Sequence, residues 1–152
     1  MNFYTSDEHY CHKNVMKYCN RPFDSVEQMN TVLIWNHNQK VGKKDKVYHL
    51  GDMVFGKTEQ WIDIVKQLNG KHYLIIGSHD KINPDIGTLF EDIQDVMDIK
   101  VDGQYVFLSH YAHRVWPRSH YDSWHLYGHS HGNLGMFGYS FDVGVDAHNG
   151  GE

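Results

Sequence analysis

Five short polar segments of this chain carry residue types that bind metal ions. They are Asp7-Glu8-His9, Gly51-Asp52, Gly77-Ser78-His79-Asp80, His110 and Gly128-His129-Ser130-His131. Each segment follows a short apolar run, so each lies at the end of a predicted strand, where loops can converge on one point. Alternate residues of an extended segment face the same side, which places His129 and His131 together. The sequence therefore predicts one polar centre built from segments far apart in the chain.

Imidazole and carboxylate groups are ligands that suit zinc, iron, manganese or nickel ions, and the chain contains 13 histidines. The five segments supply enough ligands for two ions. A carboxylate that bridges cations about 3.5–4 Å apart lets them clamp the attacking and leaving oxygens of a displacement at phosphorus. A mononuclear iron oxygenase uses similar ligand types but needs only two histidines and one carboxylate. The pattern therefore favours phosphoester hydrolysis over oxygenation.

The bulk composition limits the alternatives. A chain of 152 residues with 40% hydrophobic and 22% charged residues is typical of one globular domain, spanning 1–152. The net charge of −5 argues against binding long nucleic acids, which need a basic stripe. No apolar run reaches the roughly 18 residues of a membrane span, and we find no secretory signal. Two cysteines are too few for a disulfide scaffold, so we expect a cytoplasmic protein, in the host cytoplasm if a phage encodes it.

Helical and strand patterns alternate in the first half of the chain, and strands dominate the second half. Strands are predicted at 2–6, 46–50, 72–76, 96–101, 105–108, 125–127 and 139–145, and helices at 12–18, 25–38 and 59–68. Ser25 and Gln28 form a capping-box pattern at the start of the second helix. For the segment 83–95 we expect a helical turn near 89–93. This order predicts an α/β fold of two stacked sheets with helices outside them.

The ordered series Asp-x-His, Gly-Asp, Gly-x-His-Asp, His and Gly-His-x-His resembles the signature of the calcineurin-like metallophosphoesterases. The resemblance spans positions 5 to 146, and segments 5–9, 21–23, 48–52 and 125–131 are most similar to small bacterial and bacteriophage members. The family fold is a two-sheet α/β/β/α sandwich, which agrees with the order of elements. The resemblance therefore implies a single metallophosphoesterase domain.

The resemblance also implies that six residues hold two divalent cations. The ligands would be Asp7, His9 and His131 for the first cation, His110 and His129 for the second, and Asp52 as a bridge between both. Manganese is the first expectation for both ions, with iron, zinc and nickel as alternatives.

The third polar segment carries the implied catalytic residues and one departure from the family. His79 would contact the phosphoryl group and help the leaving oxygen depart. Asp80 would orient His79, because a catalytic imidazole usually needs its second nitrogen fixed. The family has asparagine where this chain has Ser78, and the asparagine oxygen completes the second metal site. A serine hydroxyl is a poorer ligand, so Ser78 indicates a natural variant with a weaker site, a deliberate substitution, or a chain that no longer needs catalysis.

Residues next to the polar segments are candidates for substrate binding. His12 either touches the substrate or caps the next helix. Arg114 offers a planar fork for phosphate, and Trp116 offers a ring for stacking on a base, with His113 beside them; packing within a loop is the alternative. Cys11, next to the first segment, either disturbs the metal site or is a free, half-buried thiol. Structural or surface roles are expected for His37, His49, His72, His125 and His148, and turn or surface roles for Asp142 and Asp146.

These observations predict a two-metal-dependent phosphodiesterase that acts on a small nucleotide-like or cyclic nucleotide substrate. The alternatives are a phosphomonoesterase or nucleotidase, and a catalytically silent module that binds metal and phosphate. The expected partner is a small phosphorylated molecule and not a membrane; a homo-oligomer stays open.

Overall fold

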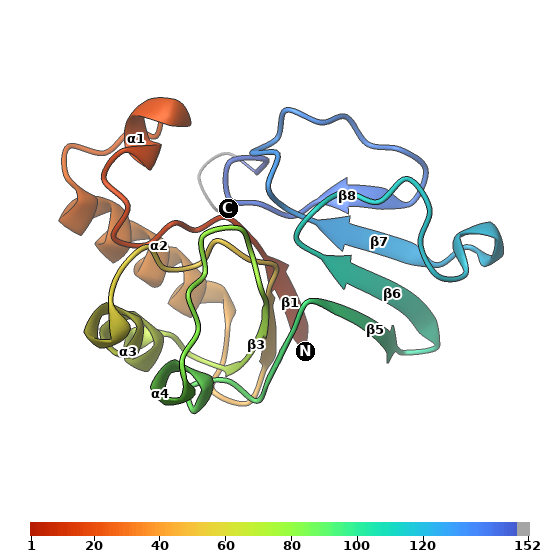
Figure 1. Ribbon diagram of the computed structural model, residues 1–152, viewed down its shortest axis with the longest axis horizontal. Coiled ribbons are helices and arrows are strands. Elements are labelled where there is room, and N and C mark those ends of the chain that lie inside the picture. Colours follow the sequence, from red (N-terminus) through yellow and green to blue (C-terminus); the bar gives the residue numbers. More distant parts are fainter. Residues whose placement is uncertain (149–152) are drawn as a thin grey trace.

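Two four-stranded sheets form the framework of the protein, seen here in a computed structural model that describes residues 1–148 (Figure 1). The first sheet is parallel and consists of β1 (Asn2–Thr5), β2 (Lys46–His49), β3 (Lys71–Ile75) and β4 (Asp92–Gln94), in that order. The second sheet consists of β5 (Val96–Val101), β6 (Gln104–Ser109), β7 (Trp124–Tyr127) and β8 (Ser140–Asp142). Strands β5 and β6 are antiparallel, and the other pairs of this sheet are parallel. The predicted two-sheet α/β fold is therefore confirmed.

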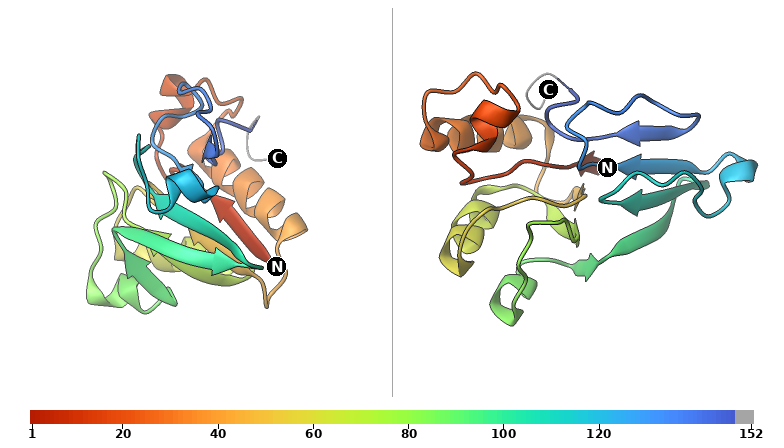
Figure 2. Two further views of the ribbon diagram at one scale, coloured as in Figure 1. Left: turned by 90° about the vertical axis from the view of Figure 1, so that its right-hand side faces the viewer. Right: turned by 45° about the horizontal axis from the view of Figure 1, so that its top comes forward.

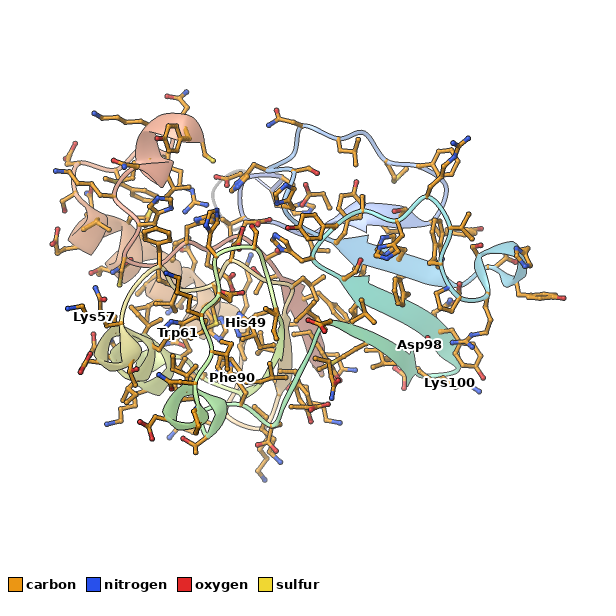
Figure 3. All side chains as sticks on the ribbon, in the orientation of Figure 1. His49, Lys57, Trp61, Phe90, Asp98 and Lys100 are labelled. Carbon is orange, nitrogen blue, oxygen red and sulfur yellow. The ribbon has the colours of Figure 1, made fainter. Side chains whose placement is uncertain are left out.

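The α-helices lie beside the first sheet, as Figure 2 shows from two further directions. They are α1 (Val15–Tyr18), α2 (Val26–Lys40), α3 (Thr58–Gln67) and α4 (Pro84–Gly87). Helix α2 begins as predicted, because the Ser25 hydroxyl accepts a hydrogen bond from the Gln28 amide at 3.1 Å. Between α3 and α4, the rings of Trp61 and Phe90 pack edge to face with their centroids 6.1 Å apart (Figure 3). The helices that the structure describes lack the combination of length and hydropathy that a membrane span needs.

The apolar core has two layers. One lies between the helices and the first sheet and includes Met29, Trp61 and Leu74. The other lies between the two sheets, where Leu50, directly after β2, belongs to the same cluster as Leu108 of β6. Residues of β6 that alternate with this layer face outward and are covered by the segment 110–123, which contains η1 (Ser119–Tyr121). In the described part of the chain this segment, and no α-helix, covers the outer face of the second sheet.

The segment 83–95 differs from the prediction of a helical turn near 89–93. The helical turn lies earlier, at α4, because the Asn83 side chain accepts a hydrogen bond from the Ile86 amide at 2.9 Å and Pro84 occupies the first turn. The later part is β4, which pairs with β3 at the edge of the first sheet. The largest shortfalls in length are at α1, which was predicted at 12–18, and at β8, which was predicted at 139–145. The last positions of the predicted domain, 149–152, lie outside the described residues.

The ends of the strands converge where the two sheets meet. Ser6 pairs with Gly144 in an isolated parallel bridge that connects the end of β1 to the segment after β8. The Val145 amide donates to the Ser6 carbonyl at 3.0 Å and reinforces this connection. The polar segments that follow β1, β2, β3, β6 and β7 therefore reach the same edge of the molecule.

Candidate metal centre

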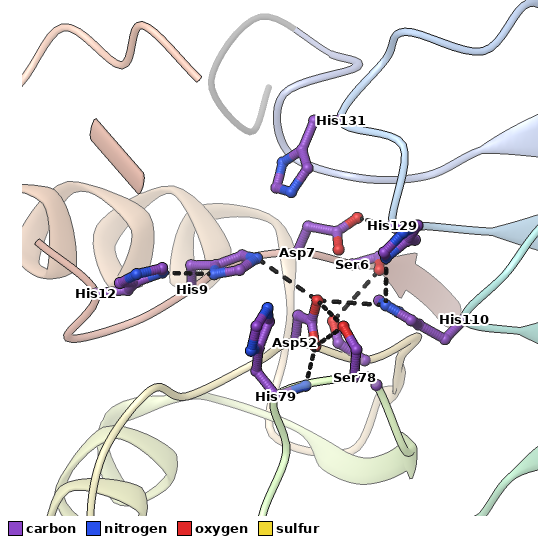
Figure 4. Close-up of polar contacts among 12 residues, drawn as sticks. Ser6, Asp7, His9, His12, Asp52, Ser78, His79, His110, His129 and His131 are labelled. Carbon is purple, nitrogen blue, oxygen red and sulfur yellow. Dashed lines mark hydrogen bonds and ion pairs between the residues drawn. The ribbon is translucent and has the colours of Figure 1, made fainter. Parts of the chain in front are cut away.

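Two groups of potential metal ligands adjoin one another at this edge (Figure 4). The first group is Asp7, His9 and His131, and the second is Asp52, His110 and His129. Within each group, one ligand atom from each residue lies within 4.8 Å of the others. The six residues that the sequence singled out as metal ligands are thus brought together by four separate loops, which follow β1, β2, β6 and β7.

Asp52 lies between the two groups. Its Oδ2 is 3.3 Å from His110 Nε2 and 3.8 Å from His9 Nε2, so one carboxylate reaches a histidine of each group. A second connection runs from the His129 amide, which donates to Asp7 Oδ2 at 2.8 Å. This geometry is what a carboxylate shared by two cations requires.

Buried atoms without partners indicate that the first group can hold a cation. Asp7 Oδ1 and His9 Nε2 are buried and have no hydrogen-bond partner among the described residues. The other ring nitrogen of His9 lies 2.9 Å from His12 Nδ1, so Nε2 is the atom left for a ligand. Native proteins rarely leave such groups unsatisfied, because each costs about 1–3 kcal/mol. The donor set therefore fits a divalent cation.

Burial sets the charge of these ligands. It lowers the pKa of His9 to about 3, which keeps the imidazole neutral and able to donate a lone pair to a metal. It raises the pKa of Asp7 to about 7. Burial also acts to raise the pKa of Asp52, but hydrogen bonds from His110 and from the His79 amide hold it below the usual range. Asp52 therefore remains a carboxylate at neutral pH.

Most of these ligands have an unusual backbone conformation. Positive φ angles occur at Asp7 (56°), His9 (51°), Asp52 (53°), His129 (65°) and His131 (48°). Only a few per cent of non-glycine residues adopt this left-handed region. Such conformations cost of order 1–3 kcal/mol each and cluster at functional sites. The loops thus hold the ligands in strained positions that surrounding contacts must stabilise.

The third polar segment packs around Asp52, and one predicted contact in it is wrong. Ser78 Oγ donates to Asp52 Oδ2 at 3.1 Å, and the His79 amide donates to Asp52 Oδ1 at 2.8 Å. Asp80 does not orient the His79 imidazole. Its carboxylate instead accepts the backbone amides of Asp52, Met53 and Gly77 at 2.8, 3.0 and 2.8 Å. Asp80 therefore fixes the loop that carries Asp52 and acts as a positioning residue.

The predicted substrate residues separate into two sets. His12 lines a cavity of about 430 Å³ together with His9, His79 and His131. Trp116 does not line this cavity. It is buried, donates Nε1–H to the Ser123 carbonyl at 3.1 Å and packs against His125 of β7. The prediction that its ring is free to stack on a base is therefore wrong.

His113 and Arg114 are also absent from that cavity. They line a different one, of about 470 Å³, between residues 112–114 and residues 134–137. The His113 amide donates to His125 Nε2 at 2.9 Å, which ties this segment to β7. Their expected contact with a substrate at the metal groups has no support from the geometry.

Two relatives share sequence with this chain. The uncharacterized protein MJ1445 of Methanocaldococcus jannaschii is 38% identical over 130 residues, which cover 84% of this chain and 68% of that protein. This chain belongs to the MJ1445 family. The Gene 66 protein of Mycobacterium phage L5 is 35% identical to it over 85 residues, or 54% of this chain and 41% of the phage protein. No protein-family model matches the chain.

Two solved structures share the fold of this member of the MJ1445 family. The protein of unknown function AQ665 from Aquifex aeolicus has a TM-score of 0.75 at 23% identity, over 97% of this chain and 91% of that one. An archaeal phosphodiesterase has a TM-score of 0.53 at 16% identity, over 93% and 80% of the two chains. At these identities the likeness is one of fold alone.

Arg21 connects the loop after β1 to the segment after β8 in this MJ1445-family chain. Its guanidinium donates to the carbonyl oxygens of Asp7 and Glu8 at 2.6 and 2.7 Å. It also pairs with Asp146, through Nε to Oδ1 at 2.9 Å and Nη2 to Oδ2 at 2.8 Å. Asp146 Oδ2 in turn lies 2.6 Å from His131 Nδ1. The turn or surface role expected for Asp146 is wrong, because this residue orients His131.

A buried chain of hydrogen bonds anchors Glu8. The Leu68 carbonyl can only accept, so His72 Nε2 donates to it at 3.3 Å and the neutral His72 accepts from His49 Nε2 at 3.0 Å. One proton is then shared between His49 Nδ1 and Glu8 Oε1, which lie 2.5 Å apart. Burial raises the pKa of Glu8 to about 7 and lowers that of His49 to about 3, which favours the proton on Glu8. These hydrogen bonds fix the loop that carries Asp7 and His9 to the sheet.

Proposed function

We propose that this protein is a two-metal-dependent phosphoesterase of the calcineurin-like metallophosphoesterase kind, which hydrolyses phosphodiesters of small nucleotide-like molecules. The observation that carries the proposal is the pair of adjoining ligand groups with Asp52 between them. The fold shared with an archaeal phosphodiesterase supports it. The net charge of −5 favours a small substrate over a long nucleic acid.

In this proposal Asp7, His9 and His131 hold one divalent cation, and His110 and His129 hold the other. Asp52 is shared by both, and manganese is the first metal to test. Two such cations would supply Lewis acidity, which offsets phosphoryl charge and lowers the pKa of water.

The protein residues supply orientation and proton transfer. His79 lies beside His9, with 6.0 Å between ring centroids, and lines the same cavity, where its imidazole would donate a proton to the leaving oxygen. Ser78 Oγ and the His79 amide both donate to Asp52 and so keep that carboxylate in place. His12 bonds to His9 and holds its ring in the orientation that directs Nε2 toward Asp52.

The cavity next to the metal ligands favours a substrate with a planar group. Phe55 is 43% exposed and stacks on His12, with 4.1 Å between ring centroids. Tyr18, which is 78% exposed, lines the same cavity. Exposed aromatic rings beside a polar centre provide stacking surfaces for nucleobases. We therefore place the nucleoside of the substrate against Phe55.

Replacing Phe55 by alanine is expected to raise KM for a nucleotide diester about tenfold, since one base–aromatic stack contributes about 1–3 kcal/mol. KM for a methyl phosphodiester should change little, because that substrate has no ring to stack. Steady-state kinetics with both substrates measures the difference. Trp35, an aromatic residue on α2 that is 61% exposed, gives the matched control Trp35→Ala. Equal loss on both substrates would contradict a stacking role.

Ser78→Asn is the direct test of the metal assignment. Ser78 already reaches Asp52, so an asparagine oxygen at this position would lie beside the second ligand group. We expect the Mn²⁺ concentration for half-maximal hydrolysis of a chromogenic phosphodiester to fall about tenfold, the scale on which a supporting residue changes metal affinity. Activity is measured across Mn²⁺ concentrations for both forms, with Asp52→Asn as the blank.

The outcomes separate the proposal from its alternatives. Hydrolysis of the diester by either form supports the proposal, and a rate equal to the blank in both forms contradicts it. Turnover of phosphomonoesters alone would favour a phosphomonoesterase or nucleotidase. Binding of Mn²⁺ and nucleotide without turnover would favour a catalytically silent module.

A further inference from the structure

A thiol lies beside His131, a residue of the first ligand group. Cys19 Sγ is 3.3 Å from His131 Nδ1, and the same nitrogen is 2.6 Å from Asp146 Oδ2. The three ligand atoms lie within 4.8 Å of one another and form a group of their own. Cys19 forms no disulfide and is partly buried. Thiolate, imidazole and carboxylate are the ligand types that bind zinc in proteins.

We propose that Cys19, His131 and Asp146 form a further metal site that takes a thiophilic divalent cation such as zinc or cadmium. The separation of sulfur and nitrogen is close to that of a tetrahedral site. Zinc bonds of about 2.3 Å to sulfur and 2.1 Å to nitrogen place those two atoms about 3.6 Å apart, against 3.3 Å observed. The carboxylate must move outward by less than 1 Å by the same geometry. Solvent would supply the fourth ligand, and manganese, which prefers oxygen, would not compete.

Because a neutral imidazole has one lone pair, His131 can bind a cation with Asp7 and His9 or with Cys19 and Asp146, but not both at once. With Asp146 accepting from Nδ1–H, the lone pair of the neutral ring is on Nε2 and is available to the group with Asp7 and His9. A cation bound at Nδ1 takes the lone pair there, and the ring proton moves to Nε2. Cys19 loses its thiol proton to solvent, so one proton is released for each cation bound. His131 then no longer serves the first group.

The site has a consequence for catalysis that rests on the proposed function. When a thiophilic cation binds, the first ligand group keeps only Asp7 and His9, so zinc or cadmium should inhibit hydrolysis supported by manganese. Asp146 can keep its contact with Arg21 during this exchange, because its Oδ1 accepts from Arg21 Nε at 2.9 Å while Oδ2 makes the small outward movement. The three residues would thus act as a metal-dependent off switch built around one histidine.

The other cysteine provides a matched control. Cys11 was expected either to disturb the metal site or to be a free thiol, and the structure supports the second reading. Its amide donates to Asn30 Oδ1 at 2.9 Å and its sulfur accepts from Asn30 Nδ2 at 3.4 Å, which directs it toward α2. Among the described residues, the groups that could hold a metal include Cys19 and not Cys11.

The test is a cadmium titration of the manganese-loaded protein, read by the ultraviolet charge-transfer band of a cadmium–thiolate bond. We expect one equivalent of this band per chain in the wild type and in Cys11→Ser, and no band in Cys19→Ser. Circular dichroism establishes that each variant is folded. Absence of the band from the wild type, or its persistence in folded Cys19→Ser, would overturn the site.

Hydrolysis is measured in a separate arm of the same experiment. We expect cadmium and zinc to inhibit the wild type and Cys11→Ser. For Cys19→Ser, the concentration of either metal that halves the uninhibited rate of that variant should be at least about tenfold higher. Because the thiolate band needs no substrate, it reports on this site even if the protein fails to hydrolyse phosphodiesters. A band without inhibition of an active enzyme would overturn the switch.

Discussion

Gly128→Ala is expected to reduce phosphodiester hydrolysis by at least about 100-fold. Gly128 follows β7, and a Cβ at this position would lie 1.9 Å from Ser6 Oγ and 2.7 Å from Asp7 Oδ2. These distances are far below contact, and the Ser6 hydroxyl cannot simply rotate away because it is buried and donates to the Leu50 carbonyl at 3.1 Å. The backbone must therefore shift by about 1 Å, and a misplacement of this size costs about 100-fold in rate. Steady-state kinetics with a chromogenic diester measures the loss.

A second glycine in the same part of the chain serves as the control. Gly135 has open space where a Cβ would be, with no atom within 4 Å. Gly135→Ala should therefore keep the wild-type rate and the wild-type Mn²⁺ affinity. A rate for Gly128→Ala equal to that of Gly135→Ala would show that the loops of β1 and β7 do not have to approach so closely for activity.

The sequence predicts the framework well where local patterns decide the structure. Strand positions follow from apolar runs that end in polar turns, and the start of α2 follows from Ser25 capping its first turn. The prediction of a helical turn near 89–93 fails. There the decisive signal was Asn83 followed by Pro84, and β4 forms because its partner β3 lies alongside. Strand pairing of this kind is a tertiary effect that no local pattern contains.

In the candidate site too, residues could be identified from the sequence, whereas contacts between distant segments could not. Asp7, Asp52 and His129 could be singled out because residue type and place at a strand end are both visible in the sequence. The partners of Asp80 could not, because they are backbone amides whose directions depend on the folded loops. Likewise, the sequence singled out Arg21 only as part of the segment 21–23 that resembles the family, and not for its contacts. Its partner Asp146 is 125 residues away, and nothing local indicates the pair.

Arg21→Met is expected to destabilise the protein by about 3–5 kcal/mol, the usual cost of breaking a buried ion pair by removing one partner. Arg21 is only 7% exposed, and methionine would fill much of its volume while leaving the Asp146 carboxylate buried without its cation. The carbonyl oxygens of Asp7 and Glu8 would also lose their donors. We expect Mn²⁺ affinity to fall about 10–100-fold as a result. Urea unfolding and Mn²⁺ binding measure the two effects.

Two further variants separate the charge of Arg21 from its geometry. Arg21→Lys keeps the charge, but an ammonium group cannot span the Asp146 carboxylate and both carbonyl oxygens as the planar fork does. It should therefore retain more of the stability than Arg21→Met and still lose Mn²⁺ affinity. In the double variant Arg21→Met, Asp146→Leu no buried charge is left unpaired, so stability should recover while metal binding does not. Wild-type Mn²⁺ affinity in both Arg21→Lys and the double variant would show that Arg21 stabilises the fold without positioning the ligands.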